Sequence, residues 1–85
     1  MARPDINLVA AAIDSFVRAF QHEGASPREV QVRPSGDDVD VIKVWVDLGA
    51  TTVDHDAWAA ACEAAIGAGV PAAPDYHVVV RAESV

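Results

Sequence analysis

The strongest constraint on the fold is the stretch VDVIKVWVDL, residues 39–48, in which apolar side chains recur at every second position. This period of two is typical of a β-strand, because successive side chains point to opposite faces of a sheet. One face of the predicted strand is wholly apolar and consists of Ile42, Val44, Val46 and Leu48. The other face is mixed and consists of Val41, Lys43, Trp45 and Asp47. The stretch therefore predicts a strand that buries one face and leaves the other outside the core.

Two shorter segments alternate in the same way. The first, EVQVR at residues 29–33, is followed by Pro34, which is expected to end the strand. The turn sequence PSGDD then leads into residues 39–48, so the first two strands are predicted to form a hairpin. The second segment, YHVVVRAE at residues 76–83, predicts the last strand.

Two other segments have the helical period. In residues 5–22, apolar positions recur three and four residues apart, and Gly24 is expected to cap the C-terminal end. Residues 54–67 predict a second helix, which is expected to stop at the GAG of residues 67–69 and the prolines that follow. Its apolar stripe consists of Trp58, Ala61, Cys62, Ala65 and Ile66.

The predicted element order is α-β-β-α-β, and 85 residues are enough for a single domain, residues 1–85. The last strand follows a helical crossover, which is right-handed where the flanking strands run parallel in one sheet. We therefore expect an α+β fold, in which a three-stranded sheet has both helices packed on one face. This order resembles a split β-α-β, or ferredoxin-like, unit that lacks its first strand.

Composition limits the partners. The chain has a net charge of −7, and its one Lys and five Arg are scattered, whereas nucleic-acid binding needs clustered cations. The element order is also similar to the second KH topology, but the phosphate-clamping GxxG of that class is missing. We expect no nucleic-acid partner and no membrane partner.

The location is predicted from two further features. Asp5 and Asp14 interrupt the first apolar run, which therefore predicts neither a signal sequence nor a membrane span. The single cysteine, Cys62, excludes a disulfide within the chain and favours a reducing compartment. A cytoplasmic protein is expected, and the abundance of Ala and the preference for Arg over Lys indicate a GC-rich bacterial genome.

The uncovered face of the sheet is the predicted working surface, because two helices on one side leave the other side open. A solvated sheet face is normally polar, yet this one carries Trp45 in its longest strand. Trp45 is interpreted either as an interface anchor or as a ring shielded beneath Lys43 and the arginines by cation–π contact. The first interpretation predicts a homo-oligomer, most simply a dimer, or contact with another protein. Its predicted interface residues are Trp45, Val41, Lys43, Val79, Arg81, Gln31 and Arg33.

An alternative hypothesis is a small-molecule site or a minor enzyme formed at a dimer interface. Its polar groups would come from His77, Tyr76, Arg81, Lys43 and Trp45. A few convergent polar groups around an aromatic side chain are typical of ligand pockets.

The remaining candidates for chemistry have simpler interpretations. Asp54, His55 and Asp56 are adjacent, so on a helix they point in different directions and do not converge on a metal. We expect Asp54 to cap the second helix and Asp56 to favour its positive end. His55 and His77 are expected at opposite ends of the crossover, and Cys62 is expected in the core. No catalytic residue, metal ligand or cofactor is predicted.

Overall fold

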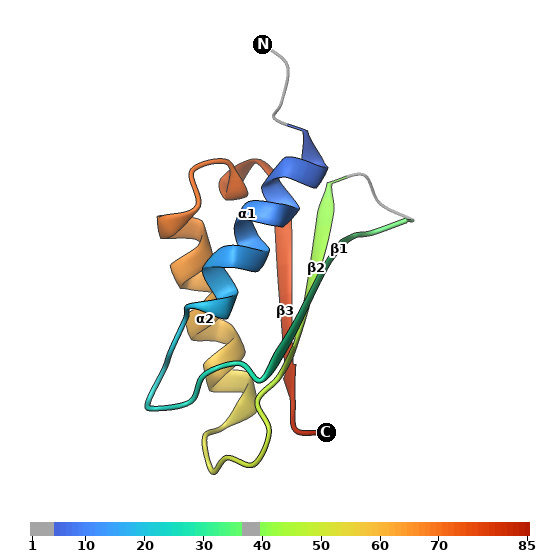
Figure 1. Cartoon of the computed structure of the whole chain (residues 1–85). Coiled ribbons are helices and arrows are strands. Elements are labelled where there is room, and N and C mark those ends of the chain that lie inside the picture. Colours follow the sequence, from blue (N-terminus) through green and yellow to red (C-terminus); the bar gives the residue numbers. More distant parts are fainter. Residues whose placement is uncertain (1–4, 37–39) are drawn as a thin grey trace.

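A computed structural model describes residues 5–36 and 40–85. It confirms the α+β fold and the predicted order of elements (Figure 1). The elements are α1 (Ile6–Arg18), β1 (Glu29–Pro34), β2 (Val41–Asp47), α2 (His55–Gly69), a short 3₁₀ turn η1 (Ala73–Asp75) and β3 (His77–Glu83). Part of the predicted turn between β1 and β2, residues 37–39, lies outside the described residues.

The sheet has the strand order β1-β2-β3. Strands β1 and β2 are antiparallel, which confirms the hairpin, and Val32 lies opposite Val44. Strands β2 and β3 are parallel, with Val44 beside Val80, as the helical crossover requires. The longest predicted strand is therefore the central one, and its two neighbours both form the edges of the sheet.

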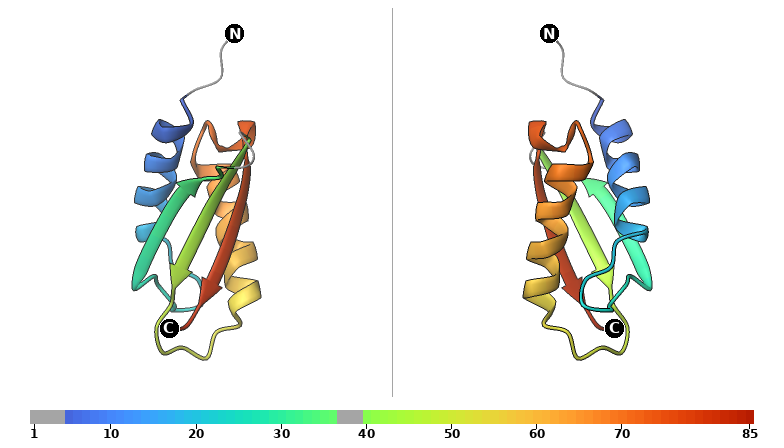
Figure 2. Two further views of the ribbon diagram at one scale, coloured as in Figure 1. Left: turned by 90° about the vertical axis from the view of Figure 1, so that its right-hand side faces the viewer. Right: turned by 90° about the vertical axis from the view of Figure 1, so that its left-hand side faces the viewer.

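Both helices lie on one side of the sheet, and the views in Figure 2 show the sheet in front of them on one side and behind them on the other. The wholly apolar face that was predicted for residues 39–48 is buried, which confirms that prediction. The apolar side chains on the helix side of the three strands are all buried or packed against the core, and they are Val30, Val32, Ile42, Val44, Val46, Leu48, Val78 and Val80. The centre of the core is Trp58 of α2, which is fully buried and donates its indole N–H to the Ala25 carbonyl at 3.0 Å.

The first helix is shorter than predicted. It ends at Arg18 with Ala19 as its C-cap, so the prediction of a helix over residues 5–22 was too long. Phe20 lies beyond the helix and packs edge-to-face on Trp58, with the ring centres 5.3 Å apart. Gly24 is not the cap: with φ of +80° it belongs to a tight turn in which His22 and Ala25 exchange backbone hydrogen bonds. A tertiary contact thus overrides the helical period.

The second helix is longer than predicted, because it continues through Gly67 to Gly69. The expectation that the GAG segment stops the helix was wrong. Gly69 faces α1, where a Cβ atom on it would lie only 2.5 Å from Cε2 of Phe16. The missing Cβ at Gly69 therefore allows the two helices to approach each other. A Cβ on Gly67 would meet no atom within 4 Å.

These two glycines give a matched pair of substitutions. We expect Gly67→Ala to raise the free energy of unfolding by about 0.5–1 kcal/mol, since alanine favours the helix. Gly69→Ala should lower it by about 1 kcal/mol, because the Phe16 ring must move and overpacking outweighs the helical gain. Urea denaturation followed by far-UV circular dichroism measures both. Equal stabilisation by the two substitutions would contradict the close contact at Gly69.

Candidate functional site

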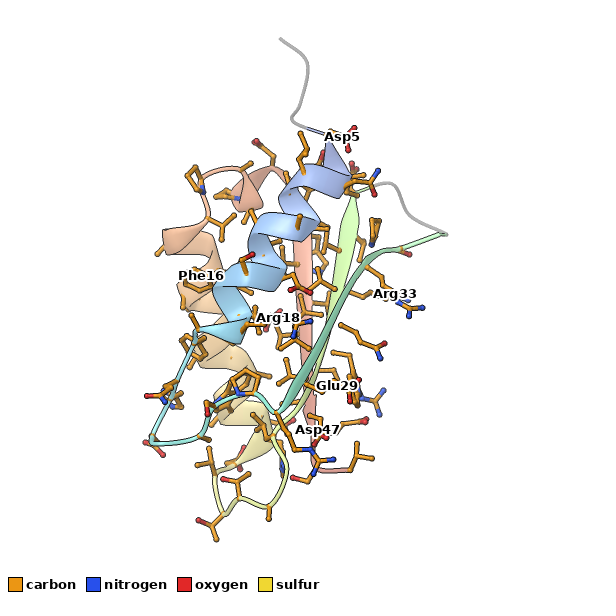
Figure 3. The ribbon with its side chains drawn as sticks, viewed as in Figure 1. Asp5, Phe16, Arg18, Glu29, Arg33 and Asp47 are labelled. Carbon is orange, nitrogen blue, oxygen red and sulfur yellow. The ribbon has the colours of Figure 1, made fainter. Side chains whose placement is uncertain are left out.

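The candidate site is the sheet face opposite the helices, which we call the open face. Strand alternation and the register place there Glu29, Gln31, Arg33, Val41, Lys43, Trp45, His77, Val79, Arg81 and Glu83. In Figure 3 the Arg33 side chain points away from both helices. The register arranges the face in rows across the strands, with Arg33, Lys43 and Val79 in one row and Gln31, Trp45 and Arg81 in the next. All predicted interface residues therefore share one surface.

Trp45 is half-buried at the middle of the open face. Its indole N–H donates to Oε2 of Glu83 at 2.9 Å, and Arg81 forms an ion pair with Oε1 of the same carboxylate at 2.8 Å. The hydrogen bond from Trp45, more than the charge of Arg81, lowers the pKa of Glu83 below its ordinary value. Glu83 orients the Trp45 ring in this way. Sequence reasoning missed Glu83, although its place two residues after Arg81 puts it on the same face.

A shallow hollow of about 390 Å³ surrounds Trp45. Its walls are Gln31, Arg33, Lys43, Val44, Trp45, Val79 and Arg81, so it contains all the predicted interface residues except Val41. The alternative set of ligand-binding residues is divided. Lys43, Trp45 and Arg81 line this hollow, whereas Tyr76 lines a separate one of about 190 Å³ beside α2.

The cations of the open face are unequally paired. Arg33 lies directly opposite Lys43 in the antiparallel register. Arg81 has its ion pair with Glu83, and within residues 5–36 and 40–85 neither Arg33 nor Lys43 has an ion pair or a side-chain hydrogen bond. Like charges directly opposite each other destabilise a sheet. Among the residues that the structure describes, this row of the face is therefore a site of uncompensated positive charge.

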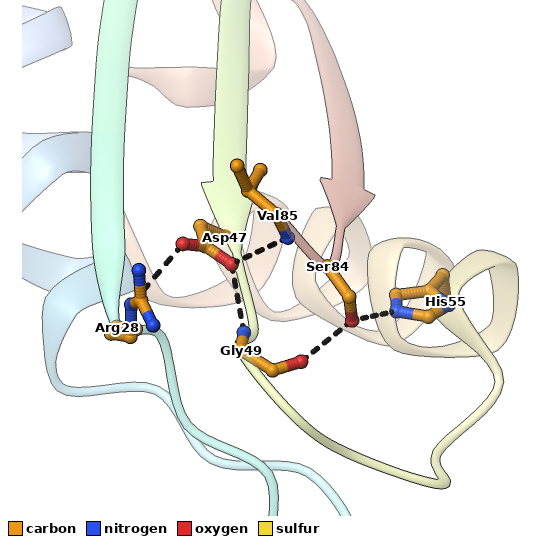
Figure 4. Close-up of polar contacts among 6 residues, drawn as sticks. All are labelled: Arg28, Asp47, Gly49, His55, Ser84 and Val85. Carbon is orange, nitrogen blue, oxygen red and sulfur yellow. Dashed lines mark hydrogen bonds and ion pairs between the residues drawn. The ribbon is translucent and has the colours of Figure 1, made fainter.

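Asp47 lies between Glu29 and Glu83 at the other end of the sheet, and its burial was not predicted from the sequence. It was assigned to the mixed face by alternation, but the side chain is only 1% exposed. Its Oδ1 accepts hydrogen bonds from the backbone N–H of Gly49 at 2.8 Å and of Val85 at 3.3 Å, and Oδ2 lies 3.3 Å from Nε of Arg28 (Figure 4). The Gly49 hydrogen bond is the main cause that lowers the pKa of Asp47. A possible sequence signal was the Asp-x-Gly after a strand, which is typical of a turn.

The Asp54-His55-Asp56 cluster is a helix start, as predicted. Oδ1 of Asp54 accepts the N–H of Ala57 at 2.9 Å and so caps α2. His55 lies beside Ser84, which follows the end of β3, whereas His77 begins that strand. The two histidines therefore lie at opposite ends of the crossover, which confirms that expectation.

His55 and Ser84 form a hydrogen bond whose direction can be assigned. Nε2 of His55 lies 2.7 Å from Oγ of Ser84, and this hydroxyl donates its proton to the Gly49 carbonyl at 2.6 Å (Figure 4). The histidine must therefore donate to the serine. Activation of a serine nucleophile needs the opposite direction, with the histidine accepting the hydroxyl proton. The arrangement joins the C-terminal end of the chain to the β2–α2 loop.

Residues 5–36 and 40–85 contain neither a cluster of metal ligands nor a helix that could span a membrane. No three or more His, Cys, Asp or Glu side chains among those residues are grouped so that they could hold a metal ion. Neither described helix has the length and apolar character to cross a membrane. Comparison of the chain with protein-family models, curated proteins and solved structures gives no match.

The pH dependence of stability tests the role of Asp47. A carboxylate whose pKa is lowered by folding stabilises the native state above its unfolded pKa, and this stabilisation is lost as the pH falls through the folded value. We expect Asp47→Asn to lower the melting temperature at pH 7 and the difference from the parent protein to narrow in acid. Arg28→Gln is the matched control and should have the smaller effect, because the Gly49 hydrogen bond outweighs the exposed ion pair. Thermal melts from pH 2.5 to 7 measure this, and equal losses in both variants would contradict it.

The thiol of Cys62 lies in the core, as predicted, and is fully buried. Burial raises its pKa to about 12, with a smaller contribution from the charge of Glu63. We expect no reaction with Ellman's reagent in the native protein at pH 8, and release of one equivalent across the denaturant unfolding transition. Rapid reaction without denaturant would show that this side of α2 opens in the native state.

Proposed function

We propose that the chain is a non-catalytic interaction domain that self-associates through its open face and serves as an accessory or regulatory subunit. One observation carries this proposal: the helices cover only one side of the sheet, and the other side centres on Trp45 in an apolar hollow of about 390 Å³. Val79, which lines the same hollow, is 39% exposed. On composition, we assign the domain to the bacterial cytoplasm.

The energy available on the open face supports self-association. Complete burial of an exposed large apolar side chain contributes roughly 1.5–3 kcal/mol before the costs of association. Trp45 is already half-buried and its N–H is satisfied by Glu83, so burying the remaining ring surface leaves no polar atom without a partner. Aromatic side chains of this kind are the commonest anchors of protein interfaces.

The strand edges are less suited to association than the open face. On β1, Nη2 of Arg18 donates to the carbonyl of Val30 at 3.1 Å, and on β3 the N–H of Val80 donates to Oε1 of Glu63 at 3.4 Å. Both helices thus extend a side chain to a backbone group of an edge strand, near the start of β1 and at the middle of β3. A second copy that added a strand there would have to displace these contacts.

A second candidate function rests on the same hollow. Its volume falls within the range of ligand pockets, and Arg33, Lys43 and Arg81 line it together with Trp45. These residues suit a small anion with a planar ring, bound by charge and by stacking. A concentration-independent monomer whose melting temperature rises with aromatic carboxylates would favour this function over self-association.

Substitution of Trp45 tests self-association. In sedimentation and light-scattering measurements from low to high micromolar concentration, we expect the parent protein to approach the mass of a dimer and Trp45→Ala to stay a monomer. Leu8→Ala is the control, because Leu8 is 71% exposed on α1, far from the open face. Circular dichroism verifies that both variants fold. A monomeric parent, or dissociation by Leu8→Ala alone, would exclude the open face as the interface.

A further inference from the structure

The charges of the open face are sorted along the strands. Arg33 and Lys43 occupy one row, and Glu29 and Glu83 occupy the row two steps away, beside the buried Asp47. Three of the six basic residues of the chain lie on this face with two of its thirteen acidic residues, Glu29 and Glu83, so the face has a net formal charge of +1. The rest of the chain therefore carries a net formal charge of −8, so this face is the part of the chain without the net negative charge that makes two copies repel each other.

Two-fold symmetry leaves two simple ways to stack this face on its own copy. If the axis runs along the strands, each row meets the same row of the partner, so cations meet cations and carboxylates meet carboxylates. If the axis runs across the strands, the two sheets are antiparallel and the row of Arg33 meets the row of Glu29. Stacked sheets keep their strands nearly aligned, so both arrangements are sterically ordinary and charge decides between them.

We infer that the partner is a second copy of this chain, stacked antiparallel on the open face with the two-fold axis across the strands near Trp45. This inference rests on the function proposed above and specifies its geometry. With the axis over the row of Trp45, β1 lies over β1 of the other copy. Arg33 of each chain then faces Glu29 of the other, so the contact occurs twice. Arg33, which has no ion pair among the described residues of the free chain, gains a partner in the dimer.

The size of the face sets the strength of the contact. Two of the strands have seven residues, and the rise per residue makes the face roughly 23 Å long. The spacing of three strands makes it roughly 14 Å wide. Its area of roughly 300 Å² is well below the ~800 Å² per partner of a standard interface. The dimer is therefore weak and exchanges with the monomer at micromolar concentrations. Charge pairs in so small a contact are exposed, so salt should weaken it.

A charge swap within one chain tests this geometry. Arg33→Glu and Glu29→Arg each place like charges together twice per dimer, so each should raise the dissociation constant about tenfold or more. The double variant Arg33→Glu, Glu29→Arg restores both pairs and the net charge, and should dimerise like the parent. Sedimentation equilibrium at low and high salt measures the four proteins. In the free chain, Glu at position 33 would face Lys43, so Arg33→Glu should not impair folding.

The outcomes separate this inference from the proposed function. Recovery of the dimer by the double variant supports antiparallel stacking. Tighter association of Arg33→Glu alone would mean that each row meets the same row of the other copy, and this result would overturn antiparallel stacking. Unchanged association in all three variants would also overturn it, while loss of the dimer in Trp45→Ala would still uphold the open face as the interface. A monomeric parent at every concentration would reject both proposals.

Discussion

The whole molecule depends on one packing constraint: two amphipathic helices bury their apolar sides against the same face of a three-stranded sheet. Trp58 is at the centre of that layer, fully buried, with its only polar atom bonded to the Ala25 carbonyl. Because the carbonyl belongs to the α1–β1 connection, this single side chain joins the second helix to the chain segment that follows the first. The layer is complete on one side, and nothing in the described chain is left to cover the other.

Polar contacts fix the end of the sheet at which β2 stops. Asp47 connects Arg28 at the entry to β1, Gly49 after β2 and Val85 after β3, so one carboxylate ties the ends of all three strands. Ser84 bonds the Gly49 carbonyl beside it and holds His55 at the start of α2. A domain this small has little apolar core to spare, and buried hydrogen bonds to a charged group are worth more than neutral ones. The acidic end of the open face thus has a structural role.

The faces of the strands and the start of α2 could be predicted from the sequence, because they depend on local periods and caps. Alternation assigned the buried apolar face of residues 39–48 correctly, and Asp54 was identified as a cap from its position alone. The ends of the helices could not be predicted, since Phe20 and Gly69 are placed by contacts with Trp58 and Phe16, which are distant in sequence. Glu83 and Asp47 were missed for the same reason: their partners come from other elements.

The open face has a charge pattern that stability does not explain. Arg33 and Lys43 face each other across β1 and β2 without a compensating carboxylate among the described residues, and a single acidic substitution at either position would remove the repulsion. The carboxylates that would neutralise them lie on the same face, displaced along the strands by two rows. In the antiparallel dimer that we propose, the displacement would place Arg33 of each chain opposite Glu29 of the other on both sides of Trp45, so the feature that weakens the free chain would also select its partner and its orientation.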